Sequence, residues 1–229
     1  MRLSIIMPAY NEEKTITKIL DKVLAVKLDL EKEIVIVDDG SKDNTVKVVK
    51  EYMKSKKGIK LIDKGVNGGK GTAVREGLKH ATGAIILIQD ADLEYDPNDY
   101  PKLLKPILEG RTKVVFGSRF LGSHKARYTF YYFGNVILSF FTRILYFRNI
   151  TDMETCYKAF TSEVKSALNL HATRFDIEPE ITAKIIKKGF RIVEVPISYY
   201  SRSFEEGKKI TWRDGLMALW YLFKYRFVD

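Results

Sequence analysis

The sequence predicts an α/β fold, in which a mainly parallel, doubly wound sheet is flanked by helices. Two observations support this prediction. Strand and helix patterns alternate through the first 116 residues with short loops between them, as successive βαβ units require. The run 85–88 is apolar without alternation, which is typical of a strand that is buried on both faces. Such a strand belongs inside a sheet that helices cover on both sides.

The first half of the chain should contain five strands and four helices. The strands are expected over residues 3–7, 34–38, 59–62, a run ending at residue 89, and 113–116. The helices are expected over residues 12–26, 43–56, 71–80 and 97–109. Asn11 stands directly before the first of these helices and is a candidate for its N-cap.

The second half has a different character. Residues 129–146 and 216–227 are rich in aromatic residues and predict amphipathic helices, with Arg143 and Arg148 near the first of them. This pattern favours a position at a membrane interface over a position in the core. Residues 175–188 read as a helix and 191–199 as extended chain. No linker interrupts the sequence, so residues 1–229 are expected to form one domain.

Composition and charge limit the possible functions. With 45% hydrophobic and 30% charged residues, the chain is typical of an ordered globular protein. Its net charge of +10 suits phosphorylated ligands, an anionic membrane surface or nucleic acid. The single cysteine, Cys156, excludes an internal disulfide and a cysteine-based zinc cluster, is expected to be a small buried residue, and fits a cytoplasmic protein. The sequence has neither a signal-peptide pattern nor about 18 consecutive apolar residues, so no transmembrane helix is expected.

Two carboxylates follow the apolar run directly, at Asp90 and Asp92. In open α/β sheets, ligands bind at the carboxyl ends of the strands. Paired carboxylates suit a divalent cation such as Mg²⁺ or Mn²⁺, which usually completes its shell with water and substrate phosphate. The sequence therefore predicts a metal-assisted site for an anionic ligand.

Other strand ends carry polar groups as well. The first strand leads into residues 8–12, and the second ends in residues 38–41, where a carboxylate could bind a ribose or a base. The glycine-rich segment 65–72 is not a P-loop, because Lys64 and Gly71 stand where that motif needs glycine and Ser or Thr. It is expected to be a flexible turn that allows a ligand to approach the backbone.

Together these segments resemble family 2 glycosyltransferases of the GT-A fold. More narrowly, they are similar to the branch that contains dolichyl-phosphate mannose and glucose synthases. The motifs that carry the resemblance are Pro8-Ala9-Tyr10-Asn11-Glu12, Asp38-Asp39-Gly40-Ser41, Asn67-Gly68-Gly69-Lys70-Gly71, Asp90-Ala91-Asp92 and Gly117-Ser118-Arg119.

The resemblance implies roles for individual residues. Asp90 and Asp92 would bind Mg²⁺ or Mn²⁺ against the donor diphosphate, and Arg119 would face that diphosphate or an acceptor phosphate. Glu94 stands where many relatives have glutamine. The donor nucleotide sugar would be bound by the following residues: Pro8, Tyr10, Glu12, Asp39, Lys70, Asp90, Ala91, Arg202 and Lys208. Arg202 and Lys208 belong to a basic loop expected to fold over the donor phosphates.

The segment 151–158 resembles the acceptor-side motif of these enzymes. Asp152 and Glu154 would lie on one face of this segment if it were extended, and both are candidate catalytic residues beside Asp92 and Arg119. For a hydroxyl acceptor, such a carboxylate would be a general base. A phosphate acceptor is already ionised and needs none, so Asp152 would then orient it.

The function implied is the inverting transfer of a hexose, mannose or glucose, from a GDP- or UDP-sugar to a polyprenyl (dolichyl) phosphate. Residues 1–122 would bind the nucleotide sugar, and 123–229 would face the acceptor and the cytoplasmic surface of a membrane. Many relatives continue into transmembrane segments, whereas this sequence ends at Asp229, so peripheral attachment is expected. Two alternatives remain: a soluble family 2 transferase with a hydroxyl acceptor, and a nucleotide- or nucleic-acid-binding module. The sequence has no basic-aromatic nucleic-acid signature, so no nucleic-acid partner is expected.

Overall fold

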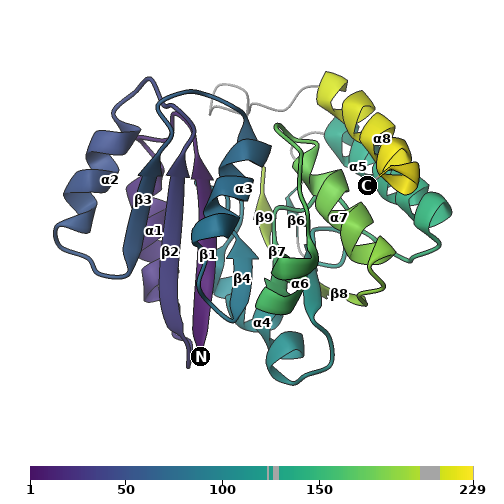
Figure 1. Ribbon diagram of the computed structural model, residues 1–229, viewed down its shortest axis with the longest axis horizontal. Helices are drawn as coiled ribbons and strands as arrows, with labels where there is room; N and C mark the ends of the chain where they lie inside the picture. Colours follow the sequence, from purple (N-terminus) through teal and green to yellow (C-terminus); the bar gives the residue numbers. More distant parts are fainter. Residues whose placement is uncertain (123, 126–128, 202–211, 229) are drawn as a thin grey trace.

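A seven-stranded sheet forms the centre of the molecule (Figure 1). The computed structural model describes residues 1–122, 124–125, 129–201 and 212–228. The strands lie in the order β3-β2-β1-β4-β7-β5-β8. Their bounds are β1 Arg2–Ala9, β2 Glu31–Asp38, β3 Ile59–Asp63, β4 Ile85–Ile88, β5 Val114–Ser118, β7 Lys158–Thr161 and β8 Ile192–Pro196. Only β7 runs antiparallel to its neighbours β4 and β5, so the predicted mainly parallel sheet is confirmed.

Helices cover both faces of this sheet. α1 and α2 pack against each other, and α3 lies on β1 and β2 across the sheet from them (Figure 1). The helices of the first half are α1 Ile16–Ala25, α2 Thr45–Met53, α3 Lys70–His80, the short 3₁₀ helix η1 Pro97–Asp99 and α4 Tyr100–Leu108. Those of the second half are α5 Thr129–Tyr146, α6 Ser162–Ala167, α7 Ile177–Lys187 and α8 Trp212–Phe227. The doubly wound arrangement is therefore as predicted.

Strand β2 shows how the sheet is buried on both faces. Ile34 and Ile36 belong to the main core, whereas Val35 and Val37 pack in a separate cluster with Ala73 of α3. Alternate side chains of a strand point to opposite faces, so an apolar run is required when both faces are covered. The same reasoning accounts for β4, whose four residues are all buried.

The start of helix α1 and the role of Asn11 both differ from the sequence prediction. α1 begins at Ile16, four residues after the predicted start, and Asn11 does not cap it. Asn11 has a positive φ of 53°, and its Oδ1 accepts a hydrogen bond from the backbone N–H of Lys42. The backbone N–H of Glu12 is in turn bound by the Thr45 hydroxyl. Residues 11–15 thus form a turn held by the loop before α2.

Strand β7 and helix α6 were not predicted. β7 has only four residues and begins with Lys158, a residue that rarely occurs in a buried strand. Lys158 is fully buried in this structure because several acceptors surround its ammonium group. A short ribbon, β6 (His124–Lys125) with β9 (Tyr199–Tyr200), lies beside the sheet.

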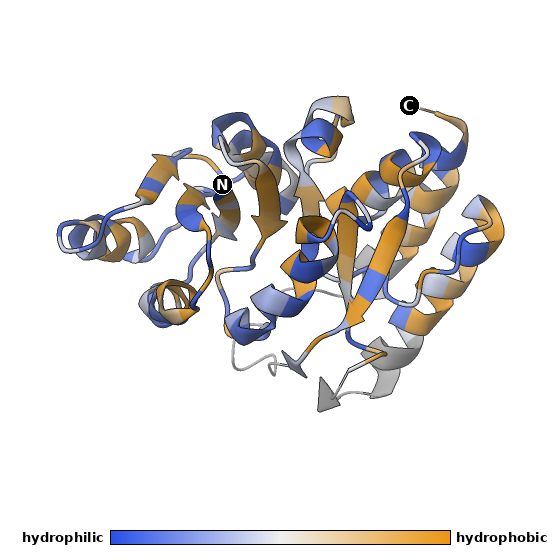
Figure 2. Ribbon diagram, turned by 90° about the horizontal axis from the view of Figure 1, so that it is seen from below, coloured by the Kyte–Doolittle hydropathy of each residue, from blue (hydrophilic) through white to orange (hydrophobic). Residues whose placement is uncertain are grey.

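Helices α5 and α8 form a pair at one end of the sheet (Figure 1). Their facing sides form a core cluster with α7, in which the Tyr146 hydroxyl donates to the carbonyl of Leu222. Much of the ribbon of these two helices is coloured hydrophobic in Figure 2. Apolar side chains are exposed on their other sides: Val136, Ile137, Phe140, Phe141 and Ile144 on α5, and Leu216, Met217, Trp220, Phe223 and Phe227 on α8. Within the described ranges, no helix is long and apolar enough to cross a bilayer.

Candidate active site

The carboxyl ends of β1, β2 and β4 meet at one edge of the sheet. β1 lies between the other two strands and is parallel to both, with Ala9 beside Asp38 and Ile6 beside Ile88. The polar segments that follow these strands, residues 8–12, 38–41 and 89–94, therefore come together as the sequence suggested. Pro8 and Tyr10 are half-buried at this edge.

Asp39 organises the glycine-rich segment. Its two carboxylate oxygens accept backbone N–H groups from Gly68 (3.1 Å) and Gly69 (2.7 Å), and it also pairs with the ammonium group of Lys64. Asp39 is buried, and its neighbour Asp38 binds the backbone and hydroxyl of Ser41. Both carboxylates thus shape the loops at the sheet edge. The carboxylate of Glu12, also buried, accepts the Thr15 hydroxyl at 2.6 Å.

The second half of the glycine-rich segment, residues 68–72, is packed, which differs from the flexible turn that the sequence suggested, whereas residues 65–67 are exposed. Gly69 has a φ of +90°, and a Cβ there would lie 2.5 Å from the carbonyl oxygen of Thr173. A Cβ on Gly71 would lie 2.7 Å from the carbonyl oxygen of Ala172. The backbone N–H groups of Gly71 and Thr72 donate to carbonyls of residues 173–174, so these first amides of α3 are already satisfied. Glycine is needed here for close backbone contact.

A buried chain of alternating charges links the metal motif to the acceptor-side motif. The ammonium group of Lys70 lies 2.8 Å from Asp90 and 3.0 Å from Glu178 of α7. Glu178 also pairs with Lys158, whose ammonium group donates to the carbonyls of Met153 (3.0 Å) and Thr155 (2.6 Å). Because every charge in this chain has an opposite partner, the attraction between them and their hydrogen bonds offset the cost of removing these groups from water.

The second metal candidate, Asp92, is buried, as is its neighbour Ala91, whereas Asp90 is half-buried. Its Oδ1 accepts the backbone N–H of Glu94 at 3.0 Å. The carboxylate of Glu94 accepts the hydroxyl of Tyr199, and its carbonyl accepts the N–H of Tyr200. Residues 90–94 are thus fixed on one side by Lys70 and on the other by strand β9.

Carboxylate oxygens of Asp90 and Asp92 are of the type that Mg²⁺ and Mn²⁺ prefer. Lys70 pairs with Asp90 at 2.8 Å in this structure, so a divalent cation would have to share that carboxylate with the ammonium group or displace it. Among the residues that the structure describes, no group of three His, Cys, Asp or Glu side chains could hold a metal. Asp90 and Asp92, which follow β4 directly, are the two carboxylates that would hold such a cation, with substrate phosphate completing its shell.

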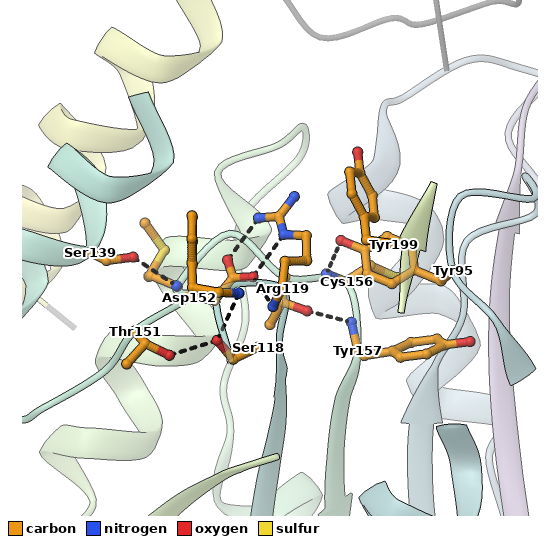
Figure 3. Close-up of polar contacts among 12 residues, drawn as sticks. Tyr95, Ser118, Arg119, Ser139, Thr151, Asp152, Cys156, Tyr157 and Tyr199 are labelled. Carbon is orange, nitrogen blue, oxygen red and sulfur yellow. Dashed lines mark hydrogen bonds and ion pairs between the residues drawn. The ribbon is translucent and has the colours of Figure 1, made fainter. Parts of the chain in front are cut away.

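Arg119 and Asp152 form a buried ion pair (Figure 3). The guanidinium donates two hydrogen bonds of 2.7 Å to the two carboxylate oxygens, and the backbone N–H of Arg119 donates a third at 2.9 Å. The guanidinium also lies over the ring of Tyr199, 5.1 Å from its centroid. The Asp152 carboxylate raises the pKa of Arg119 against the opposing effect of burial. Arg119 is thus no surface residue, and Asp152 has both oxygens occupied.

Glu154, two residues after Asp152, has different surroundings. Its Oε1 is buried and has no hydrogen-bond partner, although the residue as a whole is partly exposed. Burial raises its pKa to about 7, and the negative charge of Glu178 adds to this, while Lys158 and Arg119 oppose it. Asp152 and Glu154 therefore do not have equivalent surroundings, although both were candidates.

Cys156 is buried, as expected, and burial raises the pKa of its thiol well above its usual value. Arg202 and Lys208 lie outside the described residues.

Sequence reasoning missed Glu178 and assigned no role to Lys158. The sequence did hold one signal for Glu178. Glu178 and Glu180 stand in a helix whose apolar residues are typical of a buried element, where acidic side chains need internal partners.

Comparisons with known proteins agree with this geometry. The family model described as Glycosyl transferase family 2 matches residues 4–166. A dolichyl-phosphate beta-glucosyltransferase of Trichomonas vaginalis is 33% identical over 210 residues, which cover 86% of this chain and 65% of that protein. A dolichol-phosphate mannosyltransferase of Pyrococcus furiosus is 31% identical over 212 residues, which cover 91% of this chain and 59% of that protein. The chain thus spans less than two thirds of the length of these two relatives.

Among solved structures, glucosyl-3-phosphoglycerate synthase from Mycobacterium tuberculosis has a similar fold, with a TM-score of 0.77 at 19% identity. The similarity covers the whole of this chain and 81% of the other. That enzyme was crystallised with Mn²⁺, UDP and glucosyl-3-phosphoglycerate, and in another crystal with Mg²⁺ and UDP. The GT-A type of fold that the motifs implied is thereby confirmed.

Proposed function

This chain belongs to glycosyl transferase family 2, and from that premise we propose that it transfers a hexose from a nucleotide sugar to a polyprenyl phosphate. The observation that carries the proposal is the meeting of Asp39, Asp90 and Asp92 at the carboxyl edge of the sheet. Tyr199 links this edge to the Arg119–Asp152 pair, because its hydroxyl donates to Glu94 and its ring lies against Arg119. The names of the relatives, which are dolichyl-phosphate glucosyl- and mannosyltransferases, support the choice of acceptor. Donors with glucose or mannose on UDP or GDP are the ones to examine first.

The donor would lie across the edge formed by β1, β2 and β4. Tyr10 and Pro8 offer half-exposed surface for the base, and the loop shaped by Asp39 borders the nucleoside. Mg²⁺ or Mn²⁺ bound by Asp90 and Asp92 would stabilise the charge that develops on the departing diphosphate. Lys70, which neutralises Asp90 in this structure, supplies a further positive charge near that diphosphate. Arg202 and Lys208 would add to it.

The acceptor would approach from the side of residues 151–158. The bidentate contact with Asp152 fixes the plane of the Arg119 guanidinium, so Asp152 acts as a positioning residue. An oxygen of the acceptor phosphate attacks the anomeric carbon from the side opposite the diphosphate. The bond from that carbon to the diphosphate breaks, its electron pair leaves with the diphosphate, and the anomeric configuration is inverted.

The apolar sides of α5 and α8 are proposed to rest on the cytoplasmic surface of a membrane. Exposed basic residues accompany the apolar ones: Arg143, Arg148, Lys224 and Arg226. Apolar side chains together with Lys and Arg are the combination that binds anionic lipid surfaces. The helix pair also packs on Met153 of the acceptor-side segment, so a lipid-linked acceptor would be presented close to the site.

Single substitutions on this apolar side should weaken attachment to vesicles. Phe140 and Trp220 are 55% and 58% exposed, and replacing either with serine should lower partitioning onto vesicles with anionic lipid by about tenfold or more. Leu108→Ser is the matched control, because Leu108 is 51% exposed on α4. Co-sedimentation with vesicles measures the effect. Equal binding of all four proteins would show that this face does not contact lipid.

The function is tested by incubating the protein with UDP- and GDP-linked glucose and mannose, polyprenyl phosphate, and Mg²⁺ or Mn²⁺. Lipid-linked sugar is scored against free hexose, and sugar and glycan acceptors are run in parallel. Lipid-linked product is the expected result. Product on hydroxyl acceptors alone would overturn the choice of acceptor and favour a soluble transferase, in which Glu154, with a pKa of about 7, is the group suited to act as a general base.

A further inference from the structure

Glu154 has the only buried side-chain oxygen or nitrogen without a hydrogen-bond partner in the described part of the chain. Buried polar atoms are nearly always paired, because an unpaired one costs free energy. Such exceptions need a physical explanation, and one explanation is a group that waits for a ligand. Glu154 lies in the acceptor-side segment, between two ion pairs that are complete in themselves.

The groups around Glu154 cannot supply the missing partner. Arg119 is bound bidentately by Asp152. Lys158 donates to Glu178 and to two backbone carbonyls, which uses all three hydrogens of its ammonium group. Glu178 is shared between Lys158 and Lys70. Each neighbouring cation is thus matched by another carboxylate, and Glu154 is the acidic group left over.

We propose that the carboxyl group of Glu154 binds the acceptor phosphate by sharing a single proton with it. This inference rests on the proposed function, because it takes the acceptor to be a phosphate. The unpaired Oε1 is itself buried, so a phosphate would reach the carboxyl group through its other oxygen, on the partly exposed side of the residue. The buried, unpaired Oε1 disfavours the charged form, so the carboxyl group keeps a proton that it can donate to the phosphate. Two negative groups at such short range would repel each other, and one proton between them turns the repulsion into a strong hydrogen bond.

The shared proton ends on Glu154 in the transfer reaction, whichever form of the phosphate binds. If the phosphate arrives as a dianion, a protonated Glu154 donates to one of its oxygens and keeps its proton throughout. If the phosphate arrives as a monoanion, its proton passes to the Glu154 carboxylate before attack. In either case an unprotonated phosphate oxygen forms the bond to the anomeric carbon, and the nucleoside diphosphate leaves with the electron pair. The products are a phosphodiester monoanion and the free diphosphate, with Glu154 protonated.

The proposal predicts the pH dependence of acceptor binding. Four charged groups face Glu154: Glu178 from α7, Lys158 from β7, Arg119 after β5, and Asp152 in its own segment. Their combined effect with burial places its pKa at about 7. Above that pH the carboxyl loses its proton and repels the phosphate dianion, so the acceptor KM should rise about tenfold per pH unit. The donor KM should not follow it.

Glu154→Gln separates this contact from ionisation of the acceptor. Glutamine keeps the shape and can donate to phosphate, but it does not titrate, so the rise of the acceptor KM above pH 7 should disappear. Glu154→Ala should raise the acceptor KM about tenfold at pH 6.5, since the hydrogen bond is lost. Glu163→Gln, an exposed glutamate on α6, is the matched control and should keep the wild-type profile.

Measurements of acceptor KM, donor KM and kcat from pH 5.5 to 9 decide the proposal. It is overturned if Glu154→Gln keeps the wild-type pH profile of the acceptor KM while lipid-linked product is formed. If no lipid-linked product is formed by any protein, the proposed function itself fails instead. A loss of kcat in Glu154→Gln of about a hundredfold or more at every pH would also overturn the proposal, because it indicates a general base.

The midpoint of thermal unfolding gives a second readout. Without ligands, Glu154→Gln should melt higher than wild type at pH 8 but not at pH 4, because the raised pKa of Glu154 destabilises the folded state as the pH rises.

Discussion

Replacing Asp92 with asparagine is expected to lower the rate of metal-dependent transfer by about a thousandfold or more. A bound divalent cation supplies several kcal/mol of charge stabilisation in the transition state, and each 1.4 kcal/mol corresponds to a factor of about ten in rate. Asp92 is one of only two carboxylates proposed to hold that cation, and asparagine removes its charge with little change of shape. Product formation at saturating donor measures the effect.

The fold should survive this substitution, because the carboxamide oxygen of asparagine can still accept the backbone N–H that Asp92 now accepts from Glu94. Asp96→Asn is the matched control. Asp96 lies four residues further along and accepts hydrogen bonds from Asn98 at the start of η1, away from the proposed cation site. Circular dichroism should show both variants folded. Wild-type activity in Asp92→Asn, or equal losses in both variants, would rule out the assignment of Asp92.

Replacing Arg119 with methionine is expected to lower the free energy of unfolding by about 3 to 5 kcal/mol, the usual cost of leaving one partner of a buried ion pair uncompensated. Asp152 is fully buried, and in the variant its carboxylate keeps only the backbone N–H of residue 119 among the three hydrogen bonds that Arg119 donates. Urea unfolding of the variant and of the wild type at one pH measures this loss.

The double variant Arg119→Met, Asp152→Asn identifies the cause of that loss. It removes the uncompensated charge while leaving an oxygen for the backbone N–H, so it should recover about 2 kcal/mol or more relative to Arg119→Met. Arg111→Met is the control at an exposed ion pair with Glu109, where about 1 kcal/mol or less is expected. A double variant less stable than Arg119→Met would mean that packing around the guanidinium, and not charge, dominates.

Elements with strong local patterns could be predicted from the sequence. The apolar run of β4 and the periodicity of the helices of the first half are local signals, and the parallel order of the strands follows from their alternation with helices. β7 could not be predicted, because four residues headed by a lysine carry no strand pattern. Lys158 is tolerated in this buried strand because the tertiary fold brings Glu178 and two carbonyls to its ammonium group.

Part of the candidate site could likewise be predicted from the sequence, and part could not. Asp90 and Asp92 could be placed together with Asp39 because the carboxyl ends of parallel strands share one edge. The difference between Asp152 and Glu154 could not be inferred, since the two residues are nearly adjacent in sequence. It arises because Arg119, more than thirty positions away, reaches one carboxylate and not the other. Long-range pairing of charges is not recorded in any local pattern.

The burial of Met153 matters for any redesign of this protein. Its side chain is buried in the cluster formed by α5, α7 and α8, while the residues on either side of it carry the two carboxyl groups discussed above. The position of this segment therefore depends on how the three helices pack. A change in the buried interface between α5 and α8 should also displace residues 152–154, because protein interiors are close-packed and transmit displacements. Substitutions meant to alter only the exposed face of this helix pair should therefore leave its buried side unchanged.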